Sequence, residues 1–150
     1  MISKPDLQKL INHRFADAKA LYQKKRFHAA VYMSGYAVEL ALKNKICDLY
    51  NFTQGFSENK NEFQSYVRLT SGSSSQTLTI ENFRDIKIHD LNKLLFYSGK
   101  EYNVKNAFIR EWKSIDNWNP EMRYKIVDTN KATAQKVLSS ITTIINAVVN

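Results

Sequence analysis

The chain has 150 residues, of which 43% are hydrophobic, a formal net charge of +8 and a sequence pI near 9.5. This length and hydrophobic content predict one domain spanning residues 1–150, and the four Gly, two Pro and long stretches of helical periodicity predict an all-α fold. The single cysteine, Cys47, excludes an internal disulfide framework and a cysteine-based zinc site. Because there is neither an apolar leader nor a membrane-spanning run, we expect a cytoplasmic protein without a membrane partner.

The first predicted helix begins at Ser3, which can cap it, while Pro5 suits its first turn and Asp6 favours its positive end. Apolar residues then recur at intervals of three and four, namely Leu7, Leu10, Ile11, Phe15, Ala18, Leu21 and Tyr22. The short basic connection 23–26 implies that this helix and the next are antiparallel neighbours.

The second predicted helix, residues 26–49, is apolar on more than one side and should lie at the centre of a bundle. Its most apolar part contains Glu39, with Lys43 one turn later. A carboxylate in such a place must be paired or must face an opening. One interpretation is a buried ion pair with Lys43, Arg14 or Arg123, and the other is that Glu39 faces the same cleft as His89 and orients it or a ligand.

Residues 52–88 form a long, partly irregular connection, with a short helix expected near 59–68 and a mobile Ser-rich stretch at 71–77. A third main helix should begin at His89–Asp90 and end at Gly99, and a fourth should span about 104–118 before Asn119–Pro120. The last helix should begin near Thr129. Together the elements predict an up-and-down bundle of four to five helices.

These elements resemble the HEPN domain, a family of small helical bundles. The residues that carry the resemblance are Arg14 and Ala18, the segment AAVYMSGYAVELALK at 29–43, His89-Asp90-Leu91 with Leu94-Leu95, and Arg123-Tyr124 before a final apolar helix. The resemblance implies a homodimer without a cofactor. Many members are metal-independent ribonucleases of toxin–antitoxin or phage-defence systems, with a motif of Arg, four to six residues, then His. Other members are nucleotide-binding or assembly modules beside a minimal nucleotidyltransferase.

Arg84 and His89 fit that motif and are the candidate catalytic residues. In RNA cleavage without a metal, a base takes the proton of a ribose 2′-OH, which attacks the adjacent phosphorus. Histidine can serve as the acid or base near neutral pH, and arginine can bind phosphate oxygens. One histidine cannot easily make both proton transfers, so a homodimer would bring two copies together. The alternative is that His89 and Asp90 only cap and orient the third helix.

Five further residues are candidates for substrate binding: Glu39, Lys43, Asp90, Arg123 and Tyr124. Arg123 and Tyr124 could hold a phosphate and stack a base, or could be an ordinary ion-pairing residue and a core-edge tyrosine. The basic net charge favours a polyanionic partner such as RNA or a nucleotide. Phosphate-binding glycine loops, metal-ligand spacing and the nucleotidyltransferase pattern are absent from the sequence, so a nucleotidyltransferase or antitoxin partner would be a separate chain.

Overall fold

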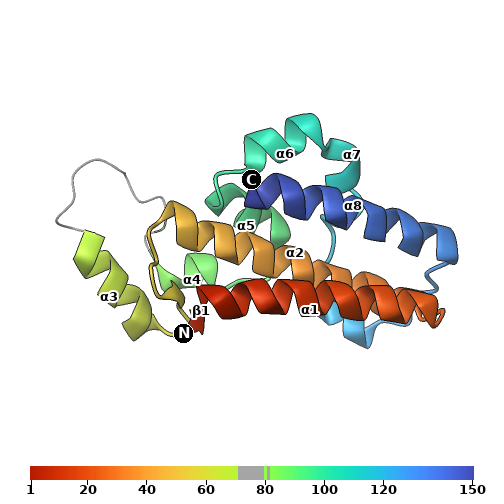
Figure 1. Cartoon of the computed structure of the whole chain (residues 1–150), viewed down its shortest axis with the longest axis horizontal. Helices are drawn as coiled ribbons and strands as arrows, with labels where there is room; N and C mark the ends of the chain where they lie inside the picture. The colour runs from red at the N-terminus through yellow and green to blue at the C-terminus, as the bar shows by residue number, and fades with distance from the viewer. Residues whose placement is uncertain (71–79, 81) are drawn as a thin grey trace.

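Three long helices form the body of the computed structural model, which describes residues 1–70, 80 and 82–150 apart from the side chains of 67–70. They are α1 (Lys4–Gln23), α2 (Phe27–Leu49) and α8 (Lys131–Val149). The central helix, α2, packs against both of the others (Figure 1). The all-α prediction is confirmed. No helix within the described residues is long and apolar enough to cross a membrane.

The first two helices begin and pack as their sequences predict. Ser3 caps α1 by accepting the amide proton of Asp6 on its hydroxyl, with N and O 3.2 Å apart. Lys25, at φ 58°, lies in the tight connection that reverses the chain into α2. α2 is buried on several sides, through residues that include Ala30, Val31, Ala37, Val38, Ala41, Leu42 and Ile46. Their burial explains why so apolar a helix occupies the centre of the bundle.

The long connection after α2 contains more regular structure than the sequence indicated. It holds β2 (Gly55–Phe56), α3 (Lys60–Thr70) at the predicted short helix, and α4 (Phe83–Ile86). β2 pairs antiparallel with β1 (Ile2–Ser3), and this small sheet was not predicted. Gly55 has φ +137°, and a Cβ there would lie 2.1 Å from the carbonyl oxygen of Ile2, so the pairing needs glycine. The stretch 71–77 that we expected to be mobile lies outside the described residues.

The third main helix is α5 (Leu91–Tyr97), which begins and ends as predicted. The fourth differs, because it begins at Glu101 and divides at Phe108 into α6 (Glu101–Ala107) and α7 (Ile109–Trp112). The expected continuation to residue 118 is wrong. The chain instead makes tight turns, in which Ile115 N bonds Trp112 O at 3.0 Å and Trp118 N bonds Ile115 O at 2.9 Å. Turns with this three-residue repeat place Trp112, Ile115 and Trp118 on one side, and all three are buried.

The turn that ends at Trp118 is fixed against α2. A Cβ on Gly35 would lie 2.2 Å from atoms of the Trp118 ring, so the indole lies directly on the glycine backbone. The indole Nε1 also donates to the carbonyl oxygen of Tyr32 at 2.9 Å. A 3₁₀ helix, η1 (Pro120–Tyr124), follows at once, and its Met122 carbonyl accepts from His28 Nε2 of α2 at 3.1 Å. These contacts hold Arg123 and Tyr124 beside the first turns of α2.

Candidate functional site

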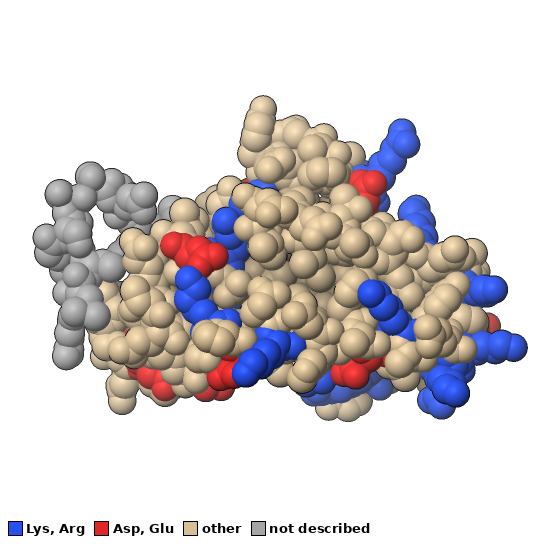
Figure 2. Space-filling model, viewed as in Figure 1, with Lys and Arg blue, Asp and Glu red and all other residues tan. Residues whose placement is uncertain are grey.

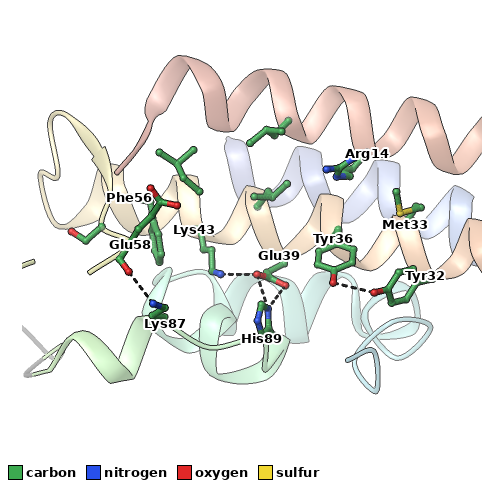
Figure 3. Close-up of a pocket in the computed structure, with 14 residues that line it drawn as sticks. Arg14, Tyr32, Met33, Tyr36, Glu39, Lys43, Phe56, Glu58, Lys87 and His89 are labelled. Atoms are coloured by element: carbon green, nitrogen blue, oxygen red, sulfur yellow. Dashed lines mark hydrogen bonds and ion pairs between the residues drawn. The ribbon is translucent and has the colours of Figure 1, made fainter. Parts of the chain in front are cut away.

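A cavity of about 700 Å³ opens along one face of α2 (Figure 3). Its floor is a stripe of α2 side chains spaced by four, three and four residues, which places them one above another on the helix: Tyr32, Tyr36, Glu39 and Lys43. Its walls come from α1, from Ile2 and Phe56 of the small sheet with the two residues that follow β2, and from the connection 87–90 between α4 and α5. We call this cavity the α2 groove.

Glu39 is the centre of the groove and is held by two cationic or hydrogen-bonding partners. Its side chain is 4% exposed, and Lys43 Nζ lies 2.6 Å from Oε1. His89 Nδ1 lies 3.0 Å from Oε1 and 2.9 Å from Oε2. A buried carboxylate needs such partners to offset its loss of hydration. The two interpretations of Glu39 therefore hold together, since it forms an ion pair with Lys43 and also orients His89.

The geometry of His89 leaves one ring nitrogen for a ligand. An ionised carboxylate can only accept, so Nδ1 carries the proton in the contact with Glu39. The side chain is 57% exposed, and Nε2 is then the nitrogen that can take or give a proton. A carboxylate that fixes the tautomer and stabilises the charged ring is the arrangement found in hydrolytic triads. This pair is therefore suited to acid–base chemistry at the surface of the groove.

The other end of the groove is aromatic. The hydroxyls of Tyr32 and Tyr36 lie 3.1 Å apart. Burial is the main cause that raises the pKa of Tyr36 to about 12, and this hydrogen bond is the second. Arg123 makes hydrogen bonds with Tyr124 and with Tyr32, and both raise its pKa, the one with Tyr124 more strongly. Its Cζ lies 4.7 Å from the centre of the Tyr124 ring. The Tyr124 ring is 76% exposed. A cation and an exposed aromatic ring therefore lie together at this end of the groove.

The groove and its surroundings carry more positive than negative charge. Its lining includes Arg14, Lys43 and Lys87, against Glu39 and Glu58. Lys87 Nζ donates to the carbonyl oxygen of Glu58 at 2.9 Å, which joins the connection 87–90 to residues 56–58 (Figure 3). Figure 2 shows further Lys and Arg side chains gathered at the end of the bundle where α1 ends and α8 begins, and the exposed cations there include Lys24, Lys25, Arg26 and Lys131. An anionic ligand suits this field.

Four of the predicted site residues do not line the α2 groove, namely Arg84, Asp90, Arg123 and Tyr124. Arg123 and Tyr124 lie beside its aromatic end. Arg84 is exposed on α4 and lines a second, smaller hollow of about 380 Å³. Asp90 lines neither hollow and instead caps α5, accepting from Lys93 N at 3.0 Å. The structure thus brings Glu39, Lys43 and His89 together, but one chain does not bring Arg84 and His89 into the same hollow.

Sequence reasoning missed several residues that line the groove. Tyr32 and Tyr36 were not proposed, although their spacing from Glu39 and Lys43 places all four on one stripe of a helix. Lys87 lies two residues before His89, and both line the groove. Residues 56–58 carried no signal, because their position depends on the pairing of β2 with β1 far earlier in the chain.

Within the described residues, no three His, Cys, Asp or Glu side chains form a group that could hold a metal ion. Comparisons of the chain with protein-family models, curated proteins and solved structures found no match. The resemblance to HEPN domains therefore stays a prediction, and the geometry of the α2 groove is the basis for assigning a function.

Proposed function

We propose that this chain is a HEPN-like protein that binds RNA in the α2 groove and cleaves it without a metal ion, with His89 transferring protons. One observation carries the proposal: His89 Nδ1 lies 2.9 Å from the buried carboxylate of Glu39, on the wall of a cationic cavity. A carboxylate-oriented imidazole beside cations is suited to phosphodiester cleavage, which needs proton transfer and stabilisation of negative charge.

In this mechanism the 2′-oxygen of a ribose attacks the adjacent phosphorus as its proton leaves. The bond to the 5′-oxygen breaks as that oxygen gains a proton, which yields a 2′,3′-cyclic phosphate and a 5′-hydroxyl. His89 Nε2 makes one of the two proton transfers, while Glu39 stabilises the imidazolium. Lys43 on the floor and Lys87 on one wall of the groove face the negative phosphorane. The second transfer falls to His89 of another copy in a homodimer, which the family resemblance implies.

The α2 groove is long enough to hold the sugar and base of a nucleotide as well as its phosphate. With the phosphate beside Lys43 and Lys87, the base extends along α2 toward Tyr36 and Tyr32. Arg123 and Tyr124 lie beyond Tyr32 and can hold the next phosphate and base, because aromatic rings and cations together bind single strands. This assigns substrate binding to Arg123 and Tyr124, as the sequence suggested.

The direct test is incubation of labelled single-stranded RNA with the protein in EDTA. Wild type is compared with His89→Ala and with His13→Ala, a matched control because His13 is exposed on α1 and lines neither hollow. We expect cyclic-phosphate products from wild type and from His13→Ala, and none from His89→Ala. Equal cleavage by all three proteins, or by none, would contradict the proposed cleavage.

A second candidate function is a nucleotide-binding or assembly module without cleavage, beside a separate nucleotidyltransferase or antitoxin chain. The observation that favours it is the position of Arg84, which lies outside the hollow that His89 lines. This candidate predicts that a mononucleotide binds the α2 groove and that RNA stays intact. Isothermal titration with adenosine 3′-monophosphate tests it, with Lys43→Ala as the variant that should lose the heat of binding.

A further inference from the structure

The connection 87–90 between α4 and α5 is a thin wall with a hollow on each side. Lys87 and His89 line the α2 groove, whereas Ile88, which lies between them in the chain, lines the second hollow. Side chains of this one connection therefore face both hollows, and the chain beside His89 separates them.

The second hollow carries the groups that bind single-stranded nucleic acid. Arg84 and Lys93 supply exposed positive charge, and the Phe96 side chain is 52% exposed. The two carboxylates of this hollow are already engaged. Asp85 accepts the backbone N–H of Asn82 at 2.8 Å in a capping box, and Glu101 accepts from Lys105 Nζ at 2.6 Å. The two cations are exposed and can reach a phosphate, and the exposed Phe96 ring can reach a base.

We infer that the second hollow is a subsite for the neighbouring nucleotide of a single-stranded RNA that crosses the wall at His89. The inference rests on the proposed function of the α2 groove. Arg84 and Lys93 bind the backbone of this nucleotide, and Phe96 stacks its base. Arg84 is then a substrate-binding residue on the far side of the wall. The scissile phosphate lies at the crossing point, beside the ring that transfers the proton.

Binding of two uncleavable probes tests this subsite. One probe is adenosine 3′-monophosphate, which fills a single site, and the other is a 2′-O-methylated RNA octamer, whose blocked 2′-oxygens cannot attack. Calorimetry for the first and fluorescence anisotropy for the second give Kd as a function of salt. The variants are Arg84→Gln/Lys93→Gln and Phe96→Ala. Their matched control is Arg110→Gln/Lys113→Gln, an exposed pair that lines neither hollow.

We expect each subsite variant to weaken octamer binding about tenfold or more, with mononucleotide binding unchanged. The slope of log K against log salt is negative, and removal of the two cations should reduce its magnitude by about 1.4, or roughly 0.7 for each phosphate contact on a single strand. The control pair should change neither quantity.

If the subsite variants and the control pair show the same octamer affinity and the same salt slope, the second subsite is overturned. The proposed binding in the α2 groove would still stand. If Lys43→Ala also leaves mononucleotide binding unaltered, or if neither probe binds the wild type, the proposed function itself fails and the subsite fails with it. The two failures are therefore distinguishable in one set of measurements.

Discussion

At the scale of single residues, Glu39 links the stability of the core to the chemistry of the groove. Its side chain is 4% exposed and holds both Lys43 and His89. Removing the charge leaves Lys43, which is only 11% exposed, without its anion. Loss of one member of a buried pair costs far more than loss of an exposed pair, because the remaining charge stays poorly hydrated.

We therefore predict that Glu39→Gln lowers the free energy of unfolding by about 3–5 kcal/mol. The chain offers a matched control in Glu101→Gln, where Lys105 Nζ lies 2.6 Å from Glu101 Oε1 with the same spacing but at the surface. That pair should be worth only about 0.3–0.5 kcal/mol. Urea denaturation of the two variants measures the difference, and equal losses would show that burial of Glu39 does not matter.

Cys47 gives the fold a dependence on alkaline pH. Burial raises the pKa of its thiol from 9.0 to about 12. Between these values the unfolded chain loses the proton while the folded chain keeps it, so the free energy of unfolding should fall as pH rises from 9 toward 12. Urea denaturation at several pH values, with and without Cys47→Ala, measures this slope. The variant should show a shallower decline, whereas an unchanged slope would mean that other groups cause it.

At the scale of elements, α5 positions His89 through its cap. Asp90 follows His89 directly and accepts the backbone N–H of Lys93 at 3.0 Å. We predict that Asp90→Ala lowers the free energy of unfolding by about 1 kcal/mol. It should also weaken binding in the α2 groove, because the connection that carries His89 would then lead into a frayed first turn of α5. Asn130→Ala removes the equivalent cap of α8, which accepts from Thr133 N at 2.8 Å. It should cost similar stability without changing the affinity for adenosine 3′-monophosphate, and a parallel loss of affinity would refute the positional role.

The contact between α2 and the turn at Trp118 is equally specific. A methyl group at Gly35 would overlap the Trp118 ring at 2.2 Å, and that ring packs on Tyr36 with centroids 4.8 Å apart. Gly35→Ala should therefore lower the free energy of unfolding by about 1–3 kcal/mol, although alanine normally favours a helix over glycine. Thermal denaturation combined with near-ultraviolet circular dichroism measures both the loss and the displaced indole. A stabilised variant would show that the ring moves aside without cost.

Local signals account for the elements that the sequence predicted correctly. Ser3 and Asp90 cap the starts of α1 and α5, and Gly99, at φ 70°, follows the end of α5, so each acts on its immediate neighbours. The break at Phe108 and the small sheet had no such mark. Phe108 is not a helix breaker, and the pairing of Ile2 with Phe56 depends on how the intervening helices pack. Glu39 was predictable as a site residue because a charge in an apolar stripe is conspicuous within one helix.

At the scale of the whole molecule, ligand binding should be visible as stability. A ligand that binds only the folded chain, at one hundred times its Kd, adds about 2.7 kcal/mol to the free energy of unfolding. For a chain of this size that raises the Tm by roughly 5–10 °C. We predict such a shift with adenosine 3′-monophosphate, which Lys43→Ala should abolish and Lys113→Ala should preserve. A thermal shift that is the same in both variants would place the ligand outside the α2 groove.

The lining of the α2 groove comes from five separated stretches of the chain, at residue 2 and around residues 10–14, 32–43, 56–58 and 87–89. During synthesis the ribosome releases these stretches in order, and α1 can pair with α2 long before the last of them has been made. A nascent chain therefore presents a partly built groove that lacks His89. Under the proposed function, an unfinished copy would not cleave the message from which it is being translated, because the site is complete only when most of the chain is present.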